Sequence, residues 1–239
     1  MTSQNPVRDA AGVALYRHEA IGVVAQVRPV RGTARLCVLL ARRESAPYAG
    51  RFALPSGPVE LDETLRESVR RHLAEKLDLS GVTYLEQLGT SSAPERDPAQ
   101  RTIATSYLGL VPTDLEPQLP ERAAWFDVDA LPELAFDHDW VISEALIRLR
   151  AKLSYTNLGF ALMPAEFTIA ELRSVYVAAL GHDVAPTNLQ RVLARRGQLV
   201  PTGTMAGPGA KGGRPARCFR FRDRELVVTD PFAVLRPDA

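Results

Sequence analysis

Short apolar runs separated by polar turns organise the first 110 residues. Two of these runs, Ile21–Val27 and Leu36–Leu40, flank the Pro/Gly-containing turn Pro29–Thr33. Their β-branched content predicts a hairpin within a sheet. Two further strands are predicted over Tyr84–Thr90 and Thr102–Leu110 for the same reason.

Three segments of this half show no sustained apolar period. We expect residues 1–12 to form a loose tail and the polar stretch Ser91–Arg101 to be a mobile connection. The segment Arg42–Ser56 is predicted to be a loop, with one short apolar run at Phe52–Leu54.

Two amphipathic helices are predicted, over Leu61–Leu79 and Trp140–Leu153, with a short strand at Ala123–Val128 before the second. The first carries an apolar residue at every fourth position, which places a stripe on one face. The stripe consists of Leu61, Leu65, Val69, Leu73 and Leu77. The apolar contacts expected from the second helix are Val141, Ala145, Ile147 and Leu149.

A helix-turn-helix pattern follows in the back half. Thr168 and Glu171 form a capping box before an apolar run that stops at Gly181. Pro186 suits the first turn of a second helix, which ends at Gly197. The inward positions of the second helix are Leu189, Val192 and Leu193, and the exposed ones are Thr187, Asn188, Gln190, Arg191, Arg195 and Arg196. Two helices joined by a tight turn, the second polar and basic, are typical of DNA-binding domains.

The residues after this pair predict a wing. A strand at Leu199–Thr202, the glycine-rich segment Gly203–Gly213 and a strand at Arg214–Phe221 follow one another. Between Gly181 and Arg224 the sequence contains nine Lys/Arg and only two Asp/Glu. Lys and Arg contact DNA phosphates, while Asn, Gln and Arg also read base edges. The predicted DNA contacts are Thr187, Asn188, Gln190, Arg191, Arg195, Lys211, Arg214 and Arg217. The alternative is a basic solvated domain that binds nothing.

Composition and charge support two domains in a chain of 239 residues. Through Leu153 the chain holds 18 Lys/Arg and 21 Asp/Glu, whereas the remainder holds 11 and 7. We therefore predict an α+β protein with domains at 1–153 and 154–239. Two distant cysteines, a polar N-terminus and no long apolar stretch favour a cytoplasmic protein without a membrane partner.

The segment from Gly57 to Leu79 resembles the Nudix signature. That signature is Gly, five residues, Glu, seven residues, then Arg-Glu-apolar-any-Glu-Glu-any-Gly-apolar. The matches at the correct spacing are Gly57, Glu63, Arg71, Leu73, Glu75 and Leu79. With the flanking hairpin and the preceding Phe52–Pro55, the resemblance covers roughly residues 15–150. It implies a Nudix α/β/α sandwich with a mixed sheet.

The departures from the signature fall on the residues that hold Mg²⁺ in active Nudix enzymes. The three carboxylate positions are His72, Glu75 and Lys76 in this chain, and Mg²⁺ prefers oxygen ligands. A lysine also repels a divalent cation. We therefore expect no catalytic residues, no bound metal, no required cofactor and no hydrolysis, since that reaction needs the metal.

A cleft that binds a nucleotide without cleaving it suits a sensor. The predicted effector contacts are Arg43, Arg51, Gly57, Arg71 and Glu75. For the two loop arginines, simple solvation is an equal alternative. The helix itself has a second interpretation, an ordinary amphipathic helix in which Glu63, Glu67, Arg71 and Glu75 form a solvated row of salt bridges.

The junction of the halves carries a more specific resemblance. The runs Leu153–Pro164, Phe167–Thr168, Asn188–Leu189 and Gly213–Ala216 are similar to the Nudix-related transcriptional regulators of NAD metabolism, the NrtR family. The resemblance implies a homodimer whose winged helices bind palindromic double-stranded DNA near NAD-biosynthesis or salvage genes. It also implies release by ADP-ribose or a related NAD metabolite, and places Tyr155 and Asn157 at the join between domains, in packing rather than ligand contact.

Two other functions remain open. The first is an active Nudix pyrophosphatase for ADP-ribose with an accessory nucleic-acid-binding domain. The second is an RNA-binding Nudix protein. Release of AMP from ADP-ribose with Mg²⁺ or Mn²⁺ would favour the first, and competition by RNA over a palindromic duplex would favour the second.

Overall fold

A computed structural model describes residues 7–77, 81–207 and 215–230, apart from the side chains of Lys76 and Leu77. The chain packs as two compact units. Unit 1 contains Met1–Val24, Val38–Gly109 and Pro117–Ala145, and unit 2 contains Ala25–Cys37, Leu110–Glu116 and Leu146–Ala239. The domain boundary expected at residues 153 and 154 stays a prediction.

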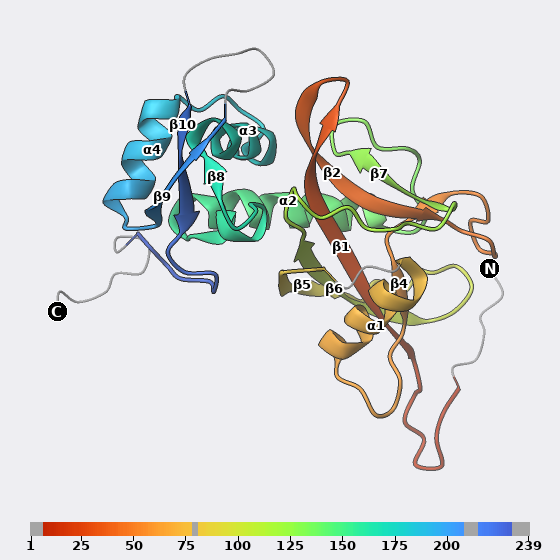
Figure 1. Cartoon of the computed structure of the whole chain (residues 1–239). Coiled ribbons are helices and arrows are strands. Elements are labelled where there is room, and N and C mark those ends of the chain that lie inside the picture. The colour runs from red at the N-terminus through yellow and green to blue at the C-terminus, as the bar shows by residue number, and fades with distance from the viewer. Residues whose placement is uncertain (1–6, 78–80, 208–214, 231–239) are drawn as a thin grey trace. The chain divides into compact units, whose positions relative to one another are not determined.

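Groups of strands are separated by single helices or helix pairs along the chain (Figure 1). The strands are β1 (Arg17–Val30), β2 (Thr33–Arg42), β3 (Phe52–Ala53), β4 (Ser56–Pro58), β5 (Tyr84–Ser91), β6 (Thr102–Leu110), β7 (Ala123–Asp127), β8 (Phe167–Thr168), β9 (Leu199–Ala206) and β10 (Ala216–Phe221). The helices are α1 (Leu65–Leu77), α2 (His138–Tyr155), α3 (Ile169–Leu180) and α4 (Pro186–Arg195), with a 3₁₀ turn η1 at Leu158–Ala161.

The described front half is built on a seven-stranded sheet with the order β3-β2-β1-β6-β5, in which β4 pairs with β1 and β7 pairs with β2. Helix α1 packs closely on this sheet at Gly22. A Cβ there would lie 3.4 Å from both Val69 and Leu73. The small residue on β1 therefore lets the apolar face of α1 approach the strand, and Val69 and Leu73 are each 1% exposed.

Helix α1 begins later than predicted, and Leu61 is fully exposed rather than part of its apolar stripe. The reason is a capping box at Thr64. Its hydroxyl accepts from the Glu67 amide at 3.3 Å, and the Glu67 carboxylate accepts from the Thr64 amide at 2.8 Å. The helix therefore begins at Leu65, directly after the cap. The four-residue apolar period that includes Leu61 predicted a start that is too early.

Helix α2 confirms three of its four predicted contacts. Val141, Ala145 and Leu149 are buried, whereas Ile147 is 62% exposed. The buried positions repeat every four residues, and position 147 lies on the opposite face from them. The predicted inward orientation of Ile147 is therefore wrong.

The segment Ser91–Arg101 is anchored, contrary to the expected mobile connection. The Arg96 side chain is 2% exposed and forms a salt bridge with Asp137 at 2.7 Å. The Asp97 carboxylate accepts from the Thr102 hydroxyl at 3.0 Å and from the Ala99 amide at 2.9 Å. Polar side chains fix this loop because they find partners outside and within it.

The helix-turn-helix lies within unit 2 at the predicted boundaries. Thr168 caps α3 with both hydrogen bonds of its capping box, and Gly181 ends α3 in the left-handed region with φ 78°. Arg173 of α3 donates to the Val184 carbonyl at 2.7 Å and to the Asp183 carboxylate at 2.5 Å. These bonds hold the turn that leads into α4.

A three-stranded sheet with the order β8-β10-β9 completes unit 2. Strand β9 extends to Ala206 and so includes the start of the segment predicted as a glycine-rich turn. Phe221 of β10 packs against Phe167 of β8, with ring centroids 5.4 Å apart.

Residues 7–16 form a short hairpin before β1. The Leu15 amide donates to the Val7 carbonyl at 2.7 Å, and Arg8 pairs with Ala14 in an antiparallel bridge. The loose tail expected over residues 1–12 is thus wrong for residues 7–12, and residues 1–6 lie outside the described part of the chain.

No helix in the described part of the chain is long and apolar enough to cross a membrane.

Candidate functional site

A polar cleft of about 340 Å³ lies in unit 1 beside the Nudix-like loop. Its walls come from four parts of the sequence: the start of β1, the loop before β3, strand β4 and the loop before β6. The lining residues with chemical relevance are Arg17, Glu19, Arg43, Ser56, Gly57 and Asp97. Its volume falls within the range of small-molecule sites.

Arg43 brings a positive charge into this cleft without a carboxylate partner among the described residues. Its guanidinium donates to the Pro47 carbonyl at 2.8 Å and lies 4.6 Å from the centre of the Phe136 ring. These contacts orient the side chain and leave its charge uncompensated. An anionic group such as a phosphate would compensate it.

His72 lies directly against Gly57. A Cβ on Gly57 would be 2.2 Å from the His72 Cε1 atom, so only glycine fits there. His72 is 3% exposed, and its Nε2 donates to the Pro58 carbonyl at 2.9 Å. The imidazole is therefore packed into the loop and turned toward a backbone oxygen.

Arg71 is held by the loop in front of α1. Its guanidinium donates to both Glu63 oxygens, at 2.6 and 2.8 Å, and to the Pro58 carbonyl at 3.1 Å. The Arg71 hydrogen bonds hold the pKa of Glu63 at about 2, well below its usual value. Glu75 is a weaker partner at 3.4 Å, with its side chain 58% exposed.

The predicted effector contacts are thus only partly brought together. Arg43 and Gly57 line the cleft, whereas Arg71 and Glu75 do not. Arg51 pairs instead with Glu133 at 2.7 Å and is not a lining residue. Sequence reasoning missed Arg17, Glu19, Asp97 and Gln100, because nothing local indicates that residues 17–19 and 97–100 meet.

His138 supports the loop that leads to Gly57. It is 1% exposed, and its Nδ1 accepts from the Leu54 amide at 2.9 Å. Burial is the main cause that lowers the pKa of His138 to about 3. The ring is therefore neutral in the folded protein at ordinary pH.

Because the folded protein lowers the pKa of His138, we expect its free energy of unfolding to decrease in acid. Between pH 6.5 and pH 3, the His138 ring is protonated in the unfolded chain and neutral in the folded chain. The free energy of unfolding should then drop by up to about 1.4 kcal/mol per pH unit from this group. Urea unfolding at pH 7 and pH 5 measures it. A His138→Asn variant, which keeps an acceptor, should lose about 1–2 kcal/mol less over this interval, and equal losses in both proteins would contradict the assignment.

Helix α4 presents a polar, basic surface in unit 2. Leu189 and Leu193 are 5% and 2% exposed and anchor the helix. The exposed side chains are Thr187, Asn188, Gln190, Arg191 and Arg195, as predicted. Arg191 donates to the Asn188 side-chain oxygen at 2.8 Å. The two side chains therefore lie together on one face.

Arg196 does not belong to this exposed set. It forms a salt bridge with Asp230 at 2.5 Å and donates to the Ser154 carbonyl at 2.6 Å. The helix has ended at Arg195, so the next side chain points toward the C-terminal segment of unit 2. The predicted exposure of Arg196 is therefore wrong.

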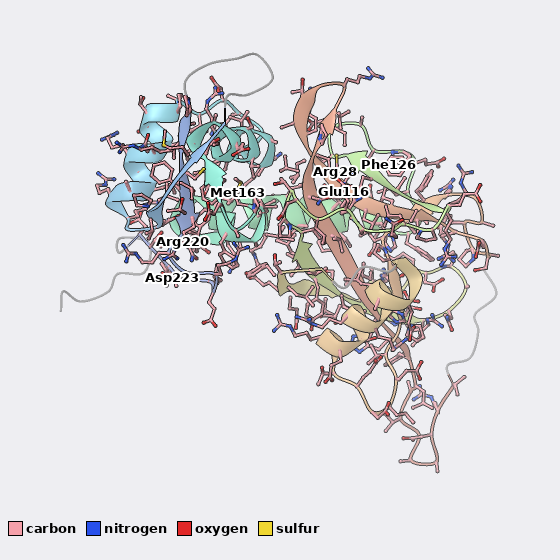
Figure 2. The ribbon with its side chains drawn as sticks, viewed as in Figure 1. Arg28, Glu116, Phe126, Met163, Arg220 and Asp223 are labelled. Atoms are coloured by element: carbon pink, nitrogen blue, oxygen red, sulfur yellow. The ribbon has the colours of Figure 1, made fainter. Side chains whose placement is uncertain are left out.

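The wing adds Arg217, exposed on β10 opposite Met205 of β9. Arg220 is exposed on the same strand and is marked in Figure 2. The other two predicted wing contacts, Lys211 and Arg214, lie outside the described residues. Together with α4, these strands provide cations on two elements of one unit.

Asn157 organises the C-terminal segment of unit 2. It is 2% exposed, donates to the Asp223 and Glu225 carbonyls at 3.2 and 2.8 Å, and accepts from the Val227 amide at 2.7 Å. Its neighbour Tyr155 accepts from the Thr229 amide through its carbonyl at 2.9 Å. Both residues therefore have structural partners within their own unit.

Comparison with known proteins matches both halves. The NUDIX domain family matches residues 16–147, and the NrtR DNA-binding winged helix domain family matches residues 159–221. The ADPR-responsive transcriptional repressor NtrR of Acinetobacter baylyi is 32% identical over 194 residues, which cover 78% of this chain and 76% of that protein. The chain belongs to the NrtR family of transcriptional regulators.

Solved structures of an NrtR protein agree with this assignment. Shewanella oneidensis NrtR in complex with a 27mer DNA has a TM-score of 0.74 and 27% identity, covering 85% of this chain and 93% of that one. Its isolated Nudix domain, solved with ADP-ribose, has a TM-score of 0.51 and 29% identity, covering 59% and 93%. An ADP-ribose pyrophosphatase of Methanocaldococcus jannaschii is 34% identical over 139 residues, covering 57% of this chain and 79% of that enzyme.

Proposed function

We propose that this chain is a repressor that binds palindromic operator DNA as a homodimer and releases it when ADP-ribose or a related NAD metabolite occupies the cleft. Its target genes would serve NAD biosynthesis or salvage. The observation that carries the proposal is the presence, in one chain, of a basic recognition helix and a nucleotide-sized cleft with an uncompensated Arg43. The DNA and ADP-ribose complexes of the Shewanella relative support both partners.

The DNA surface consists of α4 and the wing. Arg191, Arg195 and Arg217 supply phosphate or base contacts, and Thr187, Asn188 and Gln190 supply polar contacts in the major groove. Lys211 and Arg214 are proposed as additional wing cations on the basis of sequence alone. A homodimer would place two such helices on the two halves of a palindrome.

The effector contacts are proposed to centre on the cleft, with Arg43 as the phosphate ligand and Gly57 as the close backbone approach. The remaining candidates Arg51, Arg71 and Glu75 would need to reorient to reach the same ligand. Arg71 is committed to Glu63, so we assign it the role of holding the loop.

We further propose that the Nudix unit does not hydrolyse its ligand. The donor set does not suit a divalent cation, because the buried His72 ring donates to a carbonyl and Glu75 contacts a guanidinium. Lys76, the third position, lies outside the described side chains. Among the described residues, no cluster of three or more His, Cys, Asp or Glu side chains is arranged to hold a metal.

Thermodynamic linkage would couple ADP-ribose binding in the cleft to DNA binding by α4 and the wing. If ADP-ribose prefers a state of the protein that does not fit the operator, it weakens DNA binding, and DNA weakens ADP-ribose binding by the same factor. A coupling of about 1–3 kcal/mol would suffice for a switch.

A mobility shift on a palindromic duplex tests the proposal. Adding ADP-ribose should release the duplex, and AMP formation from ADP-ribose with Mg²⁺ or Mn²⁺ should stay at the level of a no-protein control. NAD and AMP serve as comparison ligands. A duplex that remains bound at saturating effector would exclude the switch.

Rapid AMP release would favour the second candidate, an ADP-ribose pyrophosphatase with an accessory nucleic-acid-binding domain. The similarity to the Methanocaldococcus enzyme favours that alternative over other Nudix activities. Glu67 and Glu75 are the carboxylates on α1, and Glu60, Asp62 and Glu63 lie in the loop before it. Hydrolysis would therefore require a metal site different from the one in the signature.

A further inference from the structure

Three consecutive residues where α2 begins, Phe136, Asp137 and His138, lie outside the cleft but contact the segments that form its walls. We call them the α2 entry segment (residues 136–138). None of the three is a lining residue of the cleft. Each side chain contacts a different wall, so one short segment of unit 1 connects parts of the cleft that are far apart in the sequence.

Phe136 contacts the loop before β3. The Arg43 guanidinium lies 4.6 Å from the centre of the Phe136 ring, which is a cation–π geometry. The Tyr48 ring of the same loop meets the Phe136 ring edge-on, with centroids 5.1 Å apart. Because an aromatic ring carries no net charge, Phe136 holds the Arg43 side chain in place without neutralising it.

The backbone of this aromatic pair is strained. Phe136 and Tyr48 both take left-handed conformations, with φ 57° and φ 64°. Bulky residues rarely adopt this region, and they remain there only where the surrounding contacts enforce it, most often at functional sites. The two strained residues contact each other next to Arg43, so the fold of unit 1 maintains this contact against a local cost.

Asp137 contacts the loop before β6. Its carboxylate accepts from the Arg96 guanidinium at 2.7 and 3.1 Å and from the Ser91 hydroxyl at 2.7 Å. A bidentate pair of this kind is strong and fixes the orientation of both partners. Asp97, the residue after Arg96, lines the cleft. The ion pair therefore fixes the position of this wall.

His138 contacts the segment that leads into β4. Its Nδ1 accepts from the Leu54 amide at 2.9 Å, and Leu54 lies two residues before the first residue of β4. The remaining wall is the start of β1, where Ala20 pairs with Gly57 of β4. The α2 entry segment thus holds three walls directly and the fourth through β4.

We propose that Phe136, Asp137 and His138 are positioning residues, which set the affinity for the effector by holding the cleft walls and do not touch the effector themselves. Groups on separate loops bind a ligand well only when they are held in place beforehand, because ordering them during binding costs free energy. Phe136 acts through Arg43, and Asp137 acts through the loop that carries Asp97. This inference rests on the cleft being the effector site of the proposed function.

Calorimetric titration of the full chain with ADP-ribose tests the role of Phe136. Phe136→Leu removes the ring and should weaken ADP-ribose binding by roughly 2- to 30-fold, the range of a cation–π contact from exposed to desolvated. Phe136→Tyr keeps the ring and should bind within about twofold of the parent. Both variants place a bulky residue in the left-handed backbone, so their comparison isolates the ring. The matched control is Trp140→Leu, which removes an exposed aromatic side chain from α2 and should bind like the parent.

A double-mutant cycle identifies the wall through which each residue acts. In an Arg43→Ala background, Phe136→Leu should weaken binding by no more than about twofold, because the guanidinium that the ring holds is gone. Asp137→Asn should weaken ADP-ribose binding in the parent and keep that effect within about twofold in the same background, since it acts on the loop before β6. Equal effects of Phe136→Leu in both backgrounds would overturn the positioning of Arg43, and parent-like binding by Asp137→Asn would overturn the role of Asp137.

Operator affinity without ADP-ribose and far-UV circular dichroism should match the parent in Phe136→Leu, whereas a general loss of folding would change both. If this variant does not fold, Asp137→Asn carries the same test. Parent-like ADP-ribose binding by Phe136→Leu, or an equal loss in Phe136→Tyr, overturns the role of the ring and leaves the proposed function intact. ADP-ribose binding without release of the operator overturns the switch and leaves the positioning role intact. A parent that does not bind ADP-ribose overturns both.

Discussion

Replacing Arg191 with alanine is expected to lower affinity for the operator duplex by roughly 5- to 150-fold, equivalent to about 1–3 kcal/mol. Arg191 is exposed on α4 and donates to Asn188 on the same face, so both side chains can reach one region of the groove. A further Arg195→Ala change should weaken binding more and reduce the slope of log K against log salt by about one for each phosphate that the protein no longer neutralises. ADP-ribose affinity should not change, because neither residue lies in unit 1.

Fluorescence anisotropy with the palindromic duplex at several salt concentrations measures these effects. The matched control is Arg70→Ala, which removes an exposed arginine from α1 in unit 1. Parent-like DNA binding by the Arg191→Ala, Arg195→Ala double variant would show that α4 is not the reading surface. An equal loss in Arg70→Ala would instead point to a general effect of charge.

Local signals explain why the helix-turn-helix boundaries could be predicted. The Thr168 capping box, the left-handed Gly181 and Pro186 in the first turn of α4 each act within a few residues. The same kind of signal defines the start of α1. Thr64 and Glu67 form a capping box that the apolar period alone did not reveal, and Leu61 was consequently misplaced.

The cleft could be predicted only in part, because its walls converge through the tertiary fold. Gly57 belongs to a recognisable motif, and Arg43 lies on the loop before it. Arg17 reaches the same cleft from the start of β1, and Asp97 reaches it from the loop before β6. Arg17 precedes the strand predicted over Ile21–Val27, and Asp97 lies in the predicted polar connection Ser91–Arg101. Neither pattern indicates a partner more than 40 residues away.

The replacement of a metal ligand by His72 was visible in the sequence, but its structural consequence was not. The substituted ring fills the space left by the missing Cβ of Gly57 and bonds to the Pro58 carbonyl. The histidine at position 72 therefore both removes a carboxylate ligand and fills the space inside the loop at Gly57. This arrangement gives the proposed lack of hydrolysis a physical basis beyond the chemistry of the donor atoms.

The Asn157→Asp variant is expected to lose roughly 2–5 kcal/mol of stability, because a buried amide that donates twice becomes a carboxyl group. The Asp223 and Glu225 carbonyls would each lose their donor, while the Val227 amide would keep an acceptor. At neutral pH the buried group must either carry an uncompensated charge or bind a proton. Urea unfolding followed by circular dichroism measures the loss.

Asn188→Asp is the control that separates folding from recognition. It makes the same chemical change on the exposed face of α4, where stability should change by no more than about 0.5 kcal/mol. Its operator affinity should nevertheless fall, because a new negative charge faces the phosphates. If both variants unfolded at the parent's urea midpoint, the hydrogen bonds of Asn157 would not hold the C-terminal segment. The two variants therefore test separate roles: the buried Asn157 amide stabilises unit 2, and the exposed Asn188 amide contributes to DNA binding.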